Sequence, residues 1–518
     1  MKYPYGKFGD NRIDKYVFKM IVGLLHELEW EKFKWNSKCT LAIQEMCRVD
    51  SDIYKLAVDG RIESIKMIET DNWNLGLAGA CLGGHQKIVD YMIEKGANDF
   101  DKGLEAACMG GFINLVDYMI EKGANDLDAG LWGACAGGLE HSINYIIEKG
   151  ADDWDCGLAG ACFGGHKQWA QYMIDKGAED MEWGLCSACF GGKSNMVDFM
   201  MEKGAHDLDN AMDGVIKGNF PEMADVLVAK GYNKWPIGLM TACEFSNIKI
   251  IDYMIDKGCR DFNRALGGAC IGGNRKIIDY IIEKAGPHWD WDWGLWGACT
   301  GGHIEIAKDM IEKGATGFNL ALAKVCGNNH HHMVDFIIEK GANDLQRAFY
   351  WACFDKHLTI AKTLLDKGLD LDVAFKMACS FNHIDFLENL LEKGATRLDW
   401  GFKMACKEGY SNIVNFLIKR GATDFNRGLR WASETGNFGV VKLLLDHGAT
   451  DINPGFLAAC HFNHIDVVKL FIDYDTIDLN SGLSTACLQG NVGITEFLIQ
   501  HGAIFCEACN NETHIFQN

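Results

Sequence analysis

The sequence predicts an all-α protein, a solenoid of about sixteen stacked helix-turn-helix repeats, and three observations lead to this prediction. A segment reading Gly-Leu-Ala-Gly-Ala-Cys at residues 76–81 recurs in recognisable form sixteen times, usually at a spacing of 27 residues. Each copy is followed by apolar residues at the i, i+3 and i+4 spacing of an amphipathic helix. Glycine is abundant, with 59 residues, and proline is rare, with 5, so tight turns must be made without proline. One such unit cannot bury its apolar stripe alone, so the units are expected to stack.

Each unit is expected to form a short first helix, a glycine turn, a second helix and a loop. Asn or Asp stands just before the first helix in thirteen of the sixteen units, as at Asn74 and Asp101, which predicts an N-cap. The second helix is expected over about His85 to Lys95. It should end at Gly96, because glycine tolerates the left-handed conformation that is common at helix ends.

Two irregular steps in the spacing locate the loops between units. One step is 29 residues long, with the extra residues around 286–288, and one is 26 residues long, with the shortening around 369–371. Insertions and deletions collect in loops. These positions therefore mark the connection between a second helix and the first helix of the next unit.

The repeat pattern also defines the expected domain organisation. The solenoid should cover residues 51–503, starting with a degenerate unit at 51–75, and it leaves no room for a second large domain. Residues 1–50 are expected to form a helical N-terminal cap, because a terminal repeat needs a polar cover. Residues 504–518 are expected to form a C-terminal tail.

Composition and charge exclude several classes of protein. With 48% hydrophobic and 23% charged residues, the chain matches an ordinary packed protein and not a disordered one. A formal net charge of −21 argues against nucleic acid or anionic lipid as a general partner. No stretch is long and apolar enough to suggest a membrane span. We therefore expect protein partners, with no nucleic acid and no membrane, and a monomeric chain.

The 21 cysteines are mostly accounted for by packing. Fourteen of them occupy the same position of the repeat, where a small buried thiol suits a tight helix interface. Successive copies should lie at helix-packing distance, which is too far for a disulfide. We therefore expect free thiols and an intracellular, reducing compartment. The fourteen are Cys81, Cys108, Cys135, Cys162, Cys189, Cys243, Cys270, Cys299, Cys326, Cys353, Cys379, Cys406, Cys460 and Cys487.

Two clusters contain the residue types of a metal site, although neither of them requires a metal. Cys506 and Cys509 form a Cys-x-x-Cys pair between His501 and His514, and such a pair can supply two zinc ligands. A frayed C-terminal tail also accounts for the pair, and His501 occupies a helix-end position. His330, the first of three consecutive histidines, falls on the turn position of the repeat, which favours a structural role. No cofactor is expected, and no catalytic set of residues stands out from the repeat background.

The repeat resembles a known family. The pattern Gly-His-x-x-Ile-Val-x-x-Met-Ile-x-Lys-Gly-Ala at residues 84–97 is similar to the second half of an ankyrin repeat. The resemblance implies an ankyrin-type solenoid that binds proteins, with shortened loops, because the family's usual period is about 33 residues. The strings at 291–299 and 428–437 further resemble the short-repeat ankyrin proteins of amoeba-infecting giant DNA viruses, the mimivirus group. This second resemblance implies an interaction protein that engages host factors in the host cytoplasm.

Side chains that vary between units indicate where a partner binds. In an ankyrin stack the start of the first helix faces a concave groove, and aromatic and arginine residues are the usual anchors of interfaces. We expect a partner groove centred on the units from Gly294 to Gly428, while single tryptophans can instead bridge adjacent repeats. The candidate residues are Trp132, Trp183, Trp293, Trp296, Tyr350, Trp351, Lys376, Trp400, Lys403, Arg427, Arg430 and Trp431.

The sequence thus predicts a non-enzymatic protein-interaction scaffold that binds its partners along the concave face. A narrower alternative is a substrate adaptor for ubiquitin ligase machinery, with residues 1–50 as the docking element. A metal-binding protein that uses Cys506 and Cys509 is the competing class.

Overall fold

The computed structural model describes residues 52–68, 70, 72–286 and 288–504. Within these residues the regular structure consists of 34 helices and contains no strand. The N-terminal cap predicted for residues 1–50 lies outside the described residues. So does the predicted C-terminal tail beyond Ile504, with Cys506, Cys509 and His514, and both expectations stay predictions.

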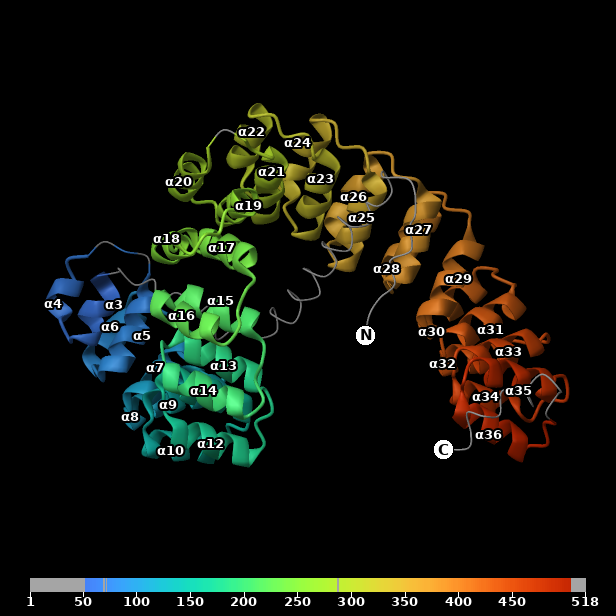
Figure 1. Ribbon diagram of the computed structural model, residues 1–518, viewed down its shortest axis with the longest axis horizontal. Coiled ribbons are helices and arrows are strands. Elements are labelled where there is room, and N and C mark those ends of the chain that lie inside the picture. Colours follow the sequence, from blue (N-terminus) through green and yellow to red (C-terminus); the bar gives the residue numbers. More distant parts are fainter. Residues whose placement is uncertain (1–51, 69, 71, 287, 505–518) are drawn as a thin grey trace. The chain divides into compact units, whose positions relative to one another are not determined.

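The helices alternate in pairs along the chain, as Figure 1 shows. We call the odd-numbered helix of each pair the first helix and the even-numbered helix the second helix. Sixteen pairs run from α5 to α36, and a shorter pair, α3 and α4, precedes them. Within each of the two compact units given below, first helices pack on the first helices of the neighbouring pairs, and each also packs on its own second helix. The predicted solenoid of sixteen helix-turn-helix repeats is confirmed.

The chain divides into two compact units, Met1–His288 and Trp289–Asn518, at the insertion around residues 286–288 that the sequence marks as a loop. The described helices of unit 1 are α3 (Asp52–Val58), α4 (Ile62–Ile65), α5 (Trp73–Gly83), α6 (Gln86–Glu94), α7 (Phe100–Gly110), α8 (Ile113–Lys122), α9 (Leu127–Gly137), α10 (Glu140–Glu148), α11 (Trp154–Gly164), α12 (Lys167–Lys176), α13 (Met181–Phe190), α14 (Ser194–Glu202), α15 (Leu208–Gly218), α16 (Pro221–Ala229), α17 (Trp235–Glu244), α18 (Ile248–Asp256), α19 (Phe262–Gly272) and α20 (Arg275–Ala285).

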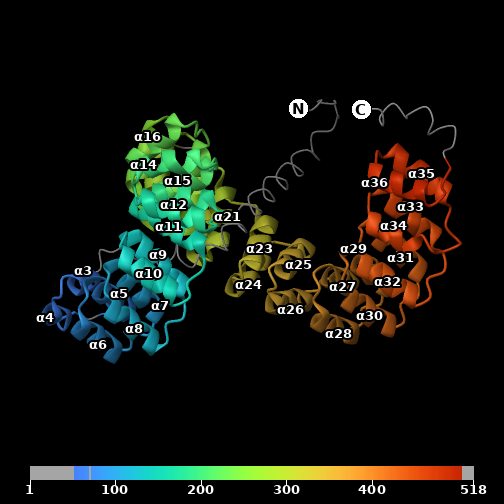
Figure 2. The same cartoon turned by 90° about the horizontal axis from the view of Figure 1, so that it is seen from below.

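Unit 2 continues the same alternation, and Figure 2 shows α25, α27, α29 and α31 in order along it, with α26, α28 and α30 beside them. Its described helices are α21 (Trp291–Gly301), α22 (Ile304–Glu312), α23 (Phe318–Gly327), α24 (His331–Glu339), α25 (Leu345–Phe354), α26 (Leu358–Asp366), α27 (Leu371–Ser380), α28 (Ile384–Glu392), α29 (Leu398–Glu408), α30 (Ser411–Lys419), α31 (Phe425–Glu434), α32 (Phe438–Asp446), α33 (Asn453–His461), α34 (Ile465–Phe471), α35 (Leu479–Leu488) and α36 (Val492–Gln500).

Acidic and amide side chains at the start of the first helix have two roles that the sequence did not separate. Asp99 is the N-cap of α7 and accepts a hydrogen bond from the backbone N–H of Lys102 at 3.2 Å. Asp101, which we predicted as the N-cap, lies inside the helix. Its Oδ1 accepts from the backbone N–H groups of Asn125 at 2.8 Å and Asp126 at 3.0 Å in the next repeat. The N-cap prediction is therefore wrong by two residues, and the repeated Asn or Asp instead ties each repeat to the next.

The same link recurs in both units, because the next repeat presents two backbone N–H groups 24 and 25 residues further along the chain. Where Glu182 replaces the usual Asn or Asp, its longer carboxylate still accepts from the N–H groups of His206 and Asp207, each at 2.9 Å. Other side chains that accept both bonds are Asn74, Asp128, Asp155, Asp292, Asn319, Asp372 and Asn426.

Histidines at the turn between the two helices form a second link between repeats. His85 Nε2 lies 2.9 Å from the carbonyl oxygen of Val58, and His330 Nε2 lies 2.9 Å from that of Thr300. The structural role predicted for His330 is confirmed. The second helix also ends as predicted, since α6 stops at Glu94 and Gly96 has a φ of 105°.

The fourteen repeated cysteines lie between neighbouring first helices. Thirteen of them are buried, Cys487 is half-buried, and all fourteen are free thiols. A Cβ atom added to Gly130 would lie 3.1 Å from Ile146 of its own repeat and 3.4 Å from Cys108 Sγ, so this glycine makes room for both side chains. Burial raises the pKa of thiols such as Cys81 and Cys108 to about 12. The predicted packing role of these cysteines is confirmed.

Glycines bring the first helices of unit 1 unusually close together. A Cβ atom on Gly160 of α11 would lie 2.2 Å from the backbone oxygen of Trp132 on α9, and one on Gly164 would lie 2.3 Å from that of Ala136. Such contacts allow Cα–H···O interactions between helices. In unit 2, four of the eight positions equivalent to Gly160 hold large apolar side chains, which do not fit so close an approach. They are Trp351, Met377, Met404 and Trp431.

Candidate protein-binding surface

Four aromatic rings gather on the first helices of unit 2, and we call them the aromatic patch: Tyr350, Trp351 and Phe354 on α25, and Phe381 at the end of α27. The Tyr350 ring centroid lies 5.2 Å from that of Trp351 and 5.1 Å from that of Phe381. Phe354 lies 5.6 Å from Trp351 and 5.9 Å from Phe381. Tyr350 and Phe354 are nevertheless 36% and 40% exposed. The patch is therefore a group of rings that pack on one another and still face water.

Basic side chains lie over the faces of three tryptophans of unit 2 that are half-buried or exposed. Lys324 Nζ is 5.7 Å from the centre of the Trp351 ring, and Lys403 Nζ is 5.5 Å from that of Trp431. The Arg397 guanidinium lies 4.0 Å from the Trp400 ring, and Trp400 is 37% exposed. A cation over a ring face is attracted by the π electrons. These side chains thus form a surface that is both aromatic and positively charged.

The structure places the other predicted residues of unit 2 on or near this surface. Lys376, Lys403, Arg427 and Arg430 are exposed, and Trp351 and Trp431 are half-buried. Arg427 forms an ion pair with Asp424 at 3.4 Å, at the start of its own helix. Trp293 and Trp296 are half-buried against each other on α21, with ring centroids 5.7 Å apart.

Trp132 does not belong to the exposed surface, and its inclusion among the candidate residues is corrected. It is 1% exposed and packs with Ala136, Ala159 and Phe190 in a core cluster across α9, α11 and α13. Its ring centroid lies 5.2 Å from that of Phe163. The cause is the close approach of the first helices in unit 1, which leaves large side chains at this position no route to solvent. Trp183, which is half-buried, packs against the same cluster.

The sequence reasoning missed three members of the surface. Phe354 lies four residues after Tyr350 on the same helix, so helical spacing could have identified it. Phe381 replaces the glycine of the usual turn, and Lys324 replaces a small residue of the first helix. For Phe381 and Lys324 the available signal was a large side chain at a position where many units carry a small one.

A group of partly buried charges lies on the first helices of unit 1. Burial, together with the nearby Asp213 carboxylate and against the opposing effect of the Lys217 ammonium, raises the pKa of the Glu244 carboxyl to about 7. Burial also lowers the pKa of Lys217. Holding Glu244 ionised in this surrounding therefore costs free energy.

Replacing Glu244 with glutamine is expected to stabilise unit 1 at pH 8 and to have little effect at pH 4.5. The folded-state pKa of Glu244, about 7, lies above the ordinary value of 4.5. The contribution of this one group to the free energy of unfolding is therefore most favourable below pH 4.5, and it is lost as the pH rises through 7. We expect a gain of about 1–2 kcal/mol at pH 8, measured by urea unfolding at both pH values. The exposed Glu202→Gln substitution is the control and should give no such difference. Equal gains at both pH values would contradict the assignment.

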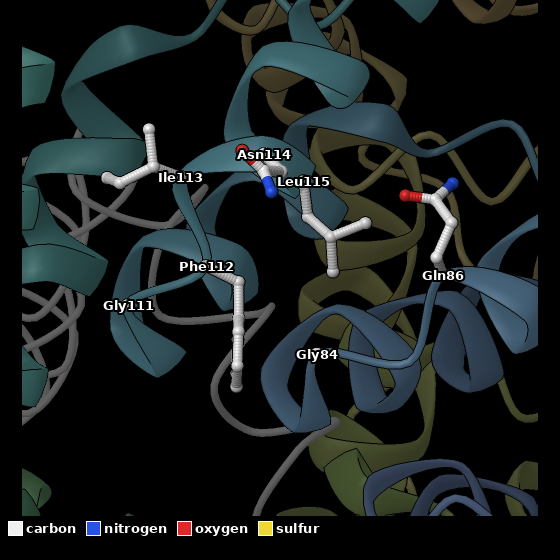
Figure 3. Close-up of a pocket in the computed structure, with 7 residues that line it drawn as sticks. All are labelled: Gly84, Gln86, Gly111, Phe112, Ile113, Asn114 and Leu115. Carbon is white, nitrogen blue, oxygen red and sulfur yellow. The ribbon is translucent and has the colours of Figure 1, made fainter.

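A shallow pocket of about 360 Å³ lies at the turns of two neighbouring repeats in unit 1 (Figure 3). The Phe112 side chain extends toward the turn at Gly84, where an added Cβ atom would meet its ring at 2.3 Å. The polar side chains of the lining are the amides of Gln86 and Asn114. This lining offers hydrogen bonds and apolar contact but no acid, base or nucleophile.

The described residues contain neither a candidate metal cluster nor a candidate membrane span. Within them, no three His, Cys, Asp or Glu side chains are grouped so as to hold a metal ion. His331 and His332 are exposed, and His332 Nε2 lies 3.3 Å from the carbonyl oxygen of Gly302. No helix in the described ranges combines the length and the apolar character needed to cross a bilayer.

The fold and the surface together define a helical-repeat solenoid of the kind that binds other proteins. A family model, "Ankyrin repeats (3 copies)", matches residues 295–375, which run from α21 to α27 and include most of the aromatic patch. The architecture is accordingly an ankyrin-type helical solenoid, and its repeats indicate a protein–protein interaction scaffold. No curated protein matches the chain. The resemblance to the giant-virus proteins stays a prediction.

Proposed function

We propose that the chain is a non-enzymatic scaffold that binds a protein partner through the first-helix face of unit 2, with the aromatic patch as the centre of the contact. The observation that carries the proposal is the patch itself. Contiguous apolar area exposed to water marks interaction sites on soluble proteins. Aromatic side chains at the centre of an interface supply most of its binding energy.

The charge around the patch indicates the character of the partner. The chain as a whole carries a net charge of −21, yet Lys324 lies over the Trp351 ring, and Lys376 and Lys403 are exposed on the next first helices, α27 and α29. Complementary charge across an interface favours the correct partner and speeds its association. The partner surface should therefore combine an apolar anchor, to cover the rings, with acidic residues beside it.

The double substitution Tyr350→Ala and Phe354→Ala is expected to abolish retention of the partner. Each ring is worth roughly 1–2 kcal/mol at the centre of an interface, so affinity should fall by about thirty-fold or more. The measurement is quantitative affinity capture from cell lysate with the immobilised intact chain, comparing wild type and variant by mass spectrometry.

The matched control is Phe438→Ala with Tyr474→Ala, two aromatic residues of unit 2 that are 44% and 38% exposed but lie away from the first helices. This control should retain the same proteins as the wild type. Equal losses in both double variants, or no loss in either, would show that the patch is not the binding surface.

A further inference from the structure

Three cations occupy the same position in three successive repeats, and we call them the cation ladder: Lys376 on α27, Lys403 on α29 and Arg430 on α31. They lie 27 residues apart in sequence, and all three are exposed. Their helices pack side by side, in order, within unit 2. The ladder begins on α27, and Phe381 of the aromatic patch directly follows the last residue of that helix.

The spacing of the ladder selects a conformation for the ligand. Helices that pack side by side are about 8–10 Å apart, so the three cations recur at about that interval. A chain in the extended polyproline II conformation advances about 3.1 Å per residue and has three residues per turn, so every third side chain lies on the same face at intervals of about 9 Å. Every third side chain of an extended segment can therefore meet one cation.

The first two cations of the ladder are available to a ligand. In the described part of the chain, no carboxylate lies within ion-pair distance of Lys376 or Lys403, and Lys403 contacts the Trp431 ring. Arg430 is partly neutralised, since its Nε lies 3.2 Å from Glu434 Oε1. Glu434 also pairs with Lys407, at 3.3 Å. Glu434 is thus an acid at the end of the ladder that opposes an incoming carboxylate.

We propose that the aromatic patch and the cation ladder together bind an extended acidic segment of the partner protein. One apolar side chain of that segment covers the aromatic patch, and Asp or Glu residues at every third position pair with Lys376, Lys403 and Arg430. This inference rests on the proposed function, because it specifies the ligand of the same surface.

A single-stranded nucleic acid is the other polyanion that a basic and aromatic surface can bind, and the geometry favours the peptide. Bases bind by stacking on open ring faces. Here the faces of Trp351, Trp400 and Trp431 already carry Lys324, Arg397 and Lys403. Glu434 lies beside the ladder and would repel a continuous phosphate chain, whereas a peptide can avoid it by its choice of side chains.

The test uses the full chain and two synthetic peptides of twelve residues with the same composition. The first carries glutamates at every third position and a leucine at each end, so that either chain direction places one leucine on the patch. The second carries the same glutamates in one consecutive run. Each exposed ion pair is worth up to about 1 kcal/mol, or roughly five-fold in affinity. We expect the periodic peptide to bind at least about five-fold more tightly by fluorescence anisotropy.

The variants probe the ladder directly. Replacing Lys376, Lys403 and Arg430 together with glutamate should abolish binding of the periodic peptide. The control triple Lys362→Glu, Lys419→Glu and Lys442→Glu makes the same change of charge on exposed positions of the second helices, and it should bind as the wild type does. Glu434→Gln should strengthen binding by about two- to five-fold, since it removes the opposing acid. A gain of this kind does not arise from misfolding.

Three results would overturn the inference: equal binding of both peptides, equal losses in both charge-reversal triples, or tighter binding of a twelve-nucleotide oligo(dT) than of the periodic peptide. Failure of the proposed scaffold function can be distinguished from failure of the acidic-segment inference. If the substitutions at Tyr350 and Phe354 abolish capture of the partner while the ladder triple leaves capture intact, the scaffold function stands and the acidic ligand is wrong. If the patch substitutions change nothing, the proposed surface itself is wrong.

Discussion

Replacing Gly160 with alanine is expected to destabilise unit 1 and to loosen the contact between α9 and α11. The added Cβ atom would lie 2.2 Å from the backbone oxygen of Trp132, and 3.0 Å from its carbonyl carbon. These are backbone atoms, so no change of rotamer relieves the clash and the two helices must separate. Overpacking of this kind costs about 1–3 kcal/mol, even though alanine is the better helix former. Denaturant unfolding, with hydrogen exchange at the amides of α9 and α11, measures the effect.

The control for this prediction is Gly439→Ala in α32. The nearest atom to its added Cβ would be Ser411 Oγ at 3.6 Å, an ordinary contact. Removing a glycine from a helix without a clash should stabilise the protein by up to about 1 kcal/mol. The two substitutions are chemically identical and should have opposite signs. If both stabilise the protein, the close approach of the first helices in unit 1 is wrong.

The repeated part of the structure could be predicted from the sequence because the same residue pattern recurs in sixteen units. Helix order, the end of the second helix at glycines such as Gly96, and the burial of the repeated cysteines all follow from local pattern and from the need to stack. The N-cap was misplaced for a reason that is also local. Asp99 immediately precedes α7, and Asp101 lies in the first turn of that helix, so either could be the N-cap from the sequence. Only the position of the next repeat shows that Asp101 accepts its hydrogen bonds from Asn125 and Asp126.

The candidate surface was only partly predictable, because exposure at one repeat position depends on the distance between helices. Trp132 and Tyr350 occupy the same position of their repeats, yet Trp132 is 1% exposed and Tyr350 is 36% exposed. The difference comes from the residue that follows. Gly133 brings α9 against α7, where an added Cβ would meet the backbone oxygen of Glu105 at 2.2 Å, whereas Trp351 at the equivalent position places a large side chain beside Gly327 of α23, whose added Cβ would lie 3.4 Å from Trp351 Cβ. A pattern of aromatic residues therefore needs the pattern of glycines beside it before it predicts a surface.

This difference leads to the second large effect. Trp132→Ala is expected to destabilise unit 1 by about 3–5 kcal/mol, as for other buried aromatic side chains. It removes a ring that contacts Ala136, Ala159 and Phe190 in one cluster. Because each repeat depends on its neighbours, the amides of α9, α11 and α13 should lose their protection together in hydrogen exchange.

Tyr350→Ala, at the same position of its repeat in unit 2, is the matched comparison. Its ring is exposed, so the free energy of unfolding should change by about 1 kcal/mol or less, while capture of the partner falls. The pair of variants thus separates a core aromatic residue from a binding one. If Trp132→Ala instead left stability intact and reduced capture, the first-helix face of unit 1 would be open to partners, and the binding surface would extend beyond unit 2. That result would contradict the idea that the helix spacing set by the glycines decides which aromatic residues are available to a partner.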